Sequence, residues 1–123
     1  MNKKQRMAEQ ILKHGFNLQR IYPESTKYGP VELCKKLHRL EIRANRLATE
    51  MCSYEWVDQD KHSDALERIE IKANEILGKG PTVFVNRDPR GYALKIRTED
   101  AKGLDIHKDW GGYGIICPEF DGN

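Results

Sequence analysis

The chain has 123 residues, a net charge of +2, and 33% charged residues against 38% hydrophobic ones. That length predicts a single domain, 1–123, and the composition is typical of a soluble globular protein with a heavily charged surface. No apolar run approaches the roughly 20 residues that span a membrane, so we expect no membrane association. No apolar segment follows the basic N-terminus, which argues against a secretory signal, and three widely spaced cysteines indicate free thiols in the cytoplasm.

The charges are distributed in blocks along the chain. Residues 1–48 carry eleven basic and four acidic side chains, whereas residues 49–78 carry three basic and eight acidic ones. This alternation suits a protein with a positive ligand face and an acidic back, and it suits an ordinary surface laced with ion pairs equally well.

Residues 1–29 are expected to form an extension made of a helix and a loop. Residues 3–14 have amphipathic spacing, with Met7 and Ile11 inward and Ala8 and Leu12 as further candidates, and Gly15 is expected to end the helix. Residues 16–22 are a weak candidate for extended structure, and residues 23–29 have the composition of a loop.

Residues 30–78 predict a helical hairpin. In the first helix, which Pro30 can begin, apolar residues recur at steps of three and four: Leu33, Leu37, Leu40, Ala44, Leu47 and Met51. The second helix starts near Asp58 or Asp60, ends at Gly78, and has the stripe His62, Leu66, Ile69, Ala73 and Ile76. Residues 39–45 resemble residues 68–74, and either a duplicated unit or shared heptad spacing explains the match.

Residues 79–120 predict a small antiparallel sheet. Two runs rich in β-branched and aromatic residues, 83–87 and 92–96, flank a turn at 88–91, which is the usual signature of a β-hairpin. Tyr92, Leu94 and Ile96 are expected on one face, and Ala93, Lys95 and Arg97 on the other, exposed face. A short helical turn at 98–103 and strands at 104–108 and 113–117 complete the sheet. The fold class is therefore α+β, with N-terminal helices packed on a small C-terminal sheet.

Five residues form the candidate ligand site. The hairpin is expected to present Arg87, Arg90 and Lys95, and the glycine-rich stretch 109–114 supplies Trp110 and Tyr113. Arginine matches phosphate oxygens in a bidentate manner, and an aromatic ring can stack on a base. This pattern favours an anionic small molecule such as a nucleotide, whereas a tight turn with Trp110 and Tyr113 in the core is the structural alternative.

No catalytic or metal site can be assembled from the sequence. The histidines are scattered, no Cys-x-x-Cys or His-Glu-x-x-His occurs, and no nucleophile has a base at a fitting spacing, so an enzyme is disfavoured and no cofactor or metal is expected. The cysteines next to apolar runs are expected to be buried and inert. Nucleic acid stays a further candidate partner because of the basic helix face, although the pI of about 8.4 is lower than usual for such domains.

Two motifs resemble a family of small phage and prophage proteins. The chain has Glu41 with an Arg-Leu-Ala run at 46–48, the hairpin at 86–95, the Asp-Trp-Gly-Gly-Tyr-Gly run at 109–114 and the Pro-Glu pair at 118–119. Arg87 stands where the family pattern has Gly. The resemblance implies a phage-type origin and action in the cytoplasm of an infected bacterium, and it implies no reaction.

We therefore expect a phage accessory protein that acts by binding, as a host-defence countermeasure that captures a phosphate-bearing nucleotide signal. The alternatives are a protein–protein inhibitor, comparable in action to an anti-CRISPR protein, and a nucleic-acid-binding phage protein. The sequence leaves oligomerisation open.

Overall fold

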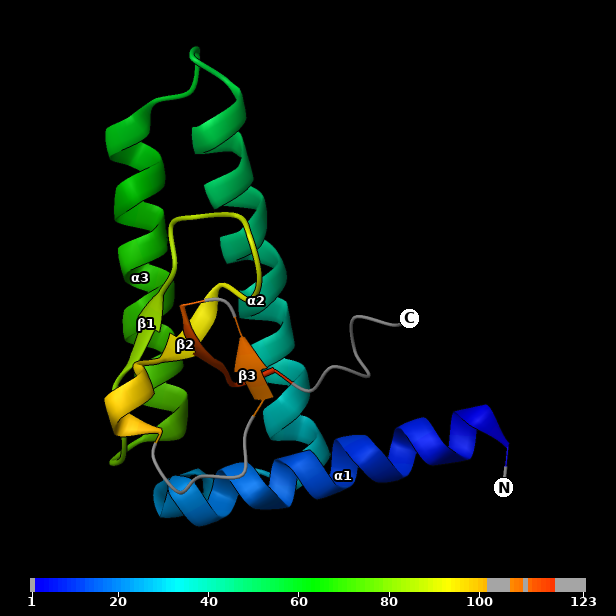
Figure 1. Cartoon of the computed structure of the whole chain (residues 1–123). Coiled ribbons are helices and arrows are strands. Elements are labelled where there is room, and N and C mark those ends of the chain that lie inside the picture. The colour runs from blue at the N-terminus through cyan, green and yellow to red at the C-terminus, as the bar shows by residue number, and fades with distance from the viewer. Residues whose placement is uncertain (1, 102–106, 110, 117–123) are drawn as a thin grey trace.

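The computed structural model describes residues 2–101, 107–109 and 111–116. The elements are the helices α1 (Lys3–Ile21), α2 (Pro30–Ser53) and α3 (Gln59–Leu77), the 3₁₀ helices η1 (Pro23–Lys27) and η2 (Thr98–Asp100), and the strands β1 (Val83–Val85), β2 (Leu94–Ile96), β3 (His107–Asp109) and β4 (Gly112–Gly114). Helices α2 and α3 form an antiparallel hairpin, the sheet lies against it, and α1 crosses the base (Figure 1). The predicted α+β class is confirmed.

The helical hairpin follows the predicted apolar stripes. Leu33, Leu37 and Leu40 of α2 are buried, as are Leu66 and Ile69 of α3. The Asp58 carboxylate caps α3 by accepting a hydrogen bond from the Lys61 N–H at 3.0 Å. Gly78 ends α3 with a φ of 77°, a conformation that glycine adopts without a steric penalty.

The predictions for residues 15–22 are wrong. Helix α1 runs through Gly15 to Ile21, so neither the predicted stop nor the extended segment is present. Gly15 is needed for packing instead, because a Cβ atom there would lie 2.3 Å from the carbonyl oxygen of Pro30, the first residue of α2. Leu18 and Tyr22 are consequently fully buried in the same core as the helical hairpin and the sheet.

The four described strands form an antiparallel sheet in the order β1-β2-β4-β3. The predicted hairpin is present, with Val83 opposite Ile96 and Val85 opposite Leu94. Val83, Leu94 and Ile96 are fully buried in the core. The helical turn expected at 98–103 contains the short helix η2, whereas residues 102–106, which include the start of the predicted third strand, lie outside the described residues.

Glu41 of α2 attaches that helix to the hairpin. Its carboxylate is 5% exposed and accepts hydrogen bonds from the backbone N–H groups of Ala93, at 2.5 Å, and Leu94, at 3.0 Å. One turn later, the Asn45 side chain donates to the Gly91 carbonyl at 3.4 Å. The start of β2 is therefore positioned by two side chains of α2.

The equivalent residues of the similar segment in α3 bind the other strand. Glu70 accepts from the Val85 N–H at 3.3 Å. The Asn74 amide donates to the Val83 carbonyl and accepts from the Val83 N–H, both at 2.9 Å. The sequence match between residues 39–45 and 68–74 thus coincides with one structural role, in which Glu and Asn four residues apart bind backbone in a strand or in the loop beside it.

Candidate functional site

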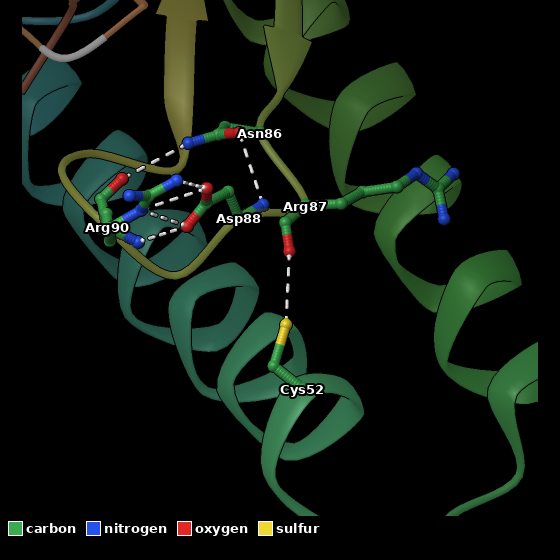
Figure 2. Close-up of polar contacts among 5 residues, drawn as sticks. All are labelled: Cys52, Asn86, Arg87, Asp88 and Arg90. Atoms are coloured by element: carbon green, nitrogen blue, oxygen red, sulfur yellow. Dashed lines mark hydrogen bonds and ion pairs between the residues drawn. The ribbon is translucent and has the colours of Figure 1, made fainter.

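The loop that joins β1 to β2 carries two of the predicted ligand-binding residues and is ordered by its own side chains (Figure 2). The Asn86 amide accepts from the Asp88 N–H and donates to the Arg90 carbonyl, both at 3.2 Å. Gly91 has a φ of 75°, as expected for the end of this turn. Such local side-chain bonds make the corner a defined structure even though it lies on the surface.

Arg90 is bound to Asp88 within this loop. Its guanidinium contacts both carboxylate oxygens, with the shortest contact, from Nη2 to Oδ2, at 2.6 Å. Hydrogen bonds from the Arg90 side chain and backbone, followed by the charges of Arg90 and Lys95, lower the pKa of Asp88 from 3.8 to about 2. Asp88 is therefore ionised at neutral pH, and it occupies the face of Arg90 that a phosphate would need.

Arg87 extends away from Arg90. Its guanidinium reaches α3, where it donates to the hydroxyl of Ser63 at 2.5 Å, and Figure 2 shows the two arginine side chains on opposite sides of the loop. A single anion of phosphate size cannot be bound by both guanidinium groups in this arrangement.

Lys95 is not on an exposed face, and that prediction is wrong. The side chain is 1% exposed, and it packs against the backbone at Gly111 and Gly112. Its ammonium lies 3.9 Å from the place where a Cβ atom on Gly111 would stand, and its charge acts on Asp88. Lys95 is therefore buried between the hairpin corner and the glycine-rich bend, which the structure does bring close to one another.

The two aromatic residues of the predicted site, Tyr113 and Trp110, have different outcomes. Tyr113 pairs with Ile96 across the sheet and packs, half-buried, against the core. Residues opposite each other share a face and successive residues alternate, so Tyr113 lies on the opposite face from Lys95. Trp110 lies outside the described residues. Among the described members of the predicted set, the structure does not direct any two toward one common pocket.

A second surface, which we did not predict from the sequence, lies in the loop between α2 and α3. Tyr54 and Trp56 stack there, with ring centroids 5.3 Å apart, and their exposed fractions are 47% and 79%. We call residues 50–64 the acidic tip, because they carry five acidic side chains and one lysine. The sequence could have indicated this surface, because Tyr54 and Trp56 lie in a short connection between helices and belong to no apolar stripe that would place them in the core.

The acidic tip is held in place from below. Val57, the residue after Trp56, is buried, and the Gln59 side chain donates to the Met51 carbonyl at 3.2 Å. His62 of α3 bonds Glu50 of α2, Nε2 to Oε2, at 2.7 Å, which joins the two helices next to the loop. The exposed rings therefore stand on a fixed support, and binding to them costs little ordering of the chain.

A third surface is a groove of about 770 Å³ beside α1. It is lined on its apolar side by Leu12 and Phe16, which are 40% and 50% exposed, so the inward placement of Leu12 was wrong. Lys13 and Arg20 contribute positive charge along the same stripe. We call this the α1 groove.

The remaining chemistry of the described residues is limited. Burial raises the pKa of the Cys34 thiol to about 11, which makes it a poor nucleophile. Among the described residues no cluster of three or more His, Cys, Asp or Glu side chains is placed to hold a metal ion. In the described part of the chain, no helix has both the length and the apolar character needed to cross a bilayer.

The fold and these surfaces define a small α+β protein with two surfaces that expose aromatic residues and a loop whose Arg90 and Asp88 form an ion pair. No family model, curated protein or solved structure matches the chain.

Proposed function

We propose that this protein is a binding module that captures a basic segment of a partner protein on its acidic tip. The observation that carries the proposal is the stacked pair of Tyr54 and Trp56, whose rings are turned to solvent on a rigid helix connection. Large exposed aromatic residues are uncommon on surfaces without a partner, and Trp and Tyr dominate the binding energy of protein interfaces.

The charge around the rings selects the partner. Glu55, Asp58 and Asp60 lie next to the aromatic pair, and all three are exposed. An acidic surface repels nucleic acid and anionic lipid, whereas a Lys or Arg side chain gains a cation–π contact with an indole and an ion pair with a carboxylate. A basic peptide segment therefore fits this surface better than a nucleotide does.

The test is isothermal titration calorimetry with a short peptide of alternating Arg and Leu, a readout that does not depend on Trp56. We expect saturable binding that weakens with salt, and Trp56→Ala should lower the affinity at least about tenfold, because central aromatic residues dominate interface energies. Ile71→Ala is the matched control. Ile71 is 54% exposed and lies in the C-terminal half of α3, away from the acidic tip, so its replacement should leave binding unchanged. Equal affinity in both variants would overturn the proposal.

Capture of a nucleotide by a phage protein in the bacterial cytoplasm is the second candidate function. The observation that favours it is Lys95, whose ammonium lies near Gly111 and acts on Asp88. The phosphate would replace the Asp88 carboxylate on Arg90, so the paired loop would be the resting form of the site.

This second proposal predicts a specific order of thermal shifts with a panel of linear and cyclic nucleotides. Asp88→Asn removes the competing carboxylate charge, so a true ligand should raise the melting temperature of this variant more than that of the wild type, by several degrees at saturation. Arg90→Ala should abolish the shift. A panel without any shift in Asp88→Asn ends the nucleotide hypothesis and leaves the acidic tip untouched.

A further inference from the structure

We infer that the acidic tip of one molecule binds the α1 groove of a second copy of this chain, so that the protein associates head to tail. The inference rests on the proposed function of the tip. It adds the identity of the partner and the symmetry of the assembly.

The two surfaces have opposite charge. Helix α1 carries five basic side chains and one acidic one, whereas the acidic tip carries five acidic side chains and one basic one. Lys13 and Arg20 outnumber Glu9 along the groove itself, and Glu55 and Asp60 flank the ring pair. Complementary fields of this kind orient two molecules as they meet and disfavour contact between two like surfaces.

The apolar parts also correspond. Leu12 and Phe16 lie four residues apart on one face of α1 and leave about half of their surface in water. The groove that they line, of about 770 Å³, is within the range of about 300–1,000 Å³ that is usual for binding clefts. Placing Tyr54 and Trp56 there would remove from water four of the six large apolar side chains that are exposed in the described residues.

One copy cannot make this contact with itself. The tip lies at the C-terminal end of α2, and α1 packs at its N-terminal end, beside Pro30, as the long axis in Figure 1 shows. A helix of 24 residues is about 36 Å long, so the two surfaces of one molecule stand at opposite ends of a rigid rod. The contact is therefore between copies and heterologous, which leads to a ring if it closes and to a filament if it does not.

The decisive experiment uses two full-length variants, each lacking one surface. Trp56→Ala keeps the groove, Phe16→Ala keeps the tip, and Ile42→Ala, at a 53% exposed site elsewhere, is the control. In sedimentation velocity over a wide concentration range, the wild type and the control should form oligomers that grow with concentration. Each surface variant should be monomeric or at least about tenfold weaker, and an equimolar mixture of the two should stop at a heterodimer.

Each other outcome contradicts the inference in a recognisable way. A mixture that stays monomeric while the wild type associates excludes the pairing of tip with groove, and self-association of Phe16→Ala at wild-type strength indicates a contact between two tips. Self-association of Trp56→Ala excludes the tip as a required surface. If the wild type is monomeric throughout, yet binds the Arg–Leu peptide through Trp56, the proposed function stands and its partner is another protein.

Discussion

Glu41→Ala is expected to lower the free energy of unfolding by about 3 kcal/mol, which is a large share of the 5–15 kcal/mol typical of a small domain. The reason is that the buried N–H groups of Ala93 and Leu94 lose the carboxylate that binds both of them. An unsatisfied buried N–H costs about 1–3 kcal/mol, and water cannot easily replace Glu41 at 5% exposure. Urea unfolding followed by circular dichroism measures the loss.

Glu70→Ala is the matched control for this prediction. Glu70 occupies the equivalent position on α3, but it is half-buried and accepts one backbone bond, at 3.3 Å. Its removal should cost about 1 kcal/mol or less, because water can reach the N–H that it leaves. Equal losses in the two variants would show that the buried carboxylate has no special role in attaching the hairpin.

Gly15→Ala is expected to destabilise the protein by about 2 kcal/mol, although the same change in an exposed helix stabilises by about 1 kcal/mol. The added Cβ would stand 2.3 Å from the backbone oxygen of Pro30, so α1 must move away from α2. The melting temperature should fall by roughly 8 °C for a domain of this size.

Gly29→Ala separates this steric effect from a general effect of glycine replacement. Nothing lies within 4 Å of a Cβ atom at Gly29, which precedes α2. Its replacement should cost at most about 1 kcal/mol, the usual difference between Gly and Ala at a helix N-cap. A gain in stability for Gly15→Ala would contradict the close approach of the two helices.

Local patterns predicted the elements whose causes are local. The steps from Leu33 to Met51 specify one face of α2, and the turn residues Asp88 and Gly91 specify the hairpin between β1 and β2. In each case neighbouring residues determine the backbone conformation, and the buried positions then follow from periodicity. The α+β class followed from these elements.

The predictions were wrong where contacts with a distant part of the chain determine the local structure or the burial of a residue. Gly15 has the chemistry of a helix stop, but the close passage of Pro30 explains why it lies within a helix. Lys95 alternates like an exposed strand residue, but the bend at Gly111 and Gly112 packs against its side chain. The pairing of Arg90 with Asp88 was readable from their separation of two residues, whereas no local sequence pattern predicts the stacking of Tyr54 on Trp56.

The bonds from Asn74 and Glu70 to β1 have a consequence for solubility. Val83 and Val85 direct their backbone polar groups away from β2, where an incoming strand from another molecule could pair with them. Side chains of α3 already satisfy the N–H groups of both residues and the carbonyl of Val83. An incoming strand could therefore pair with β1 only by displacing these α3 side chains, which disfavours extension of the sheet at this edge.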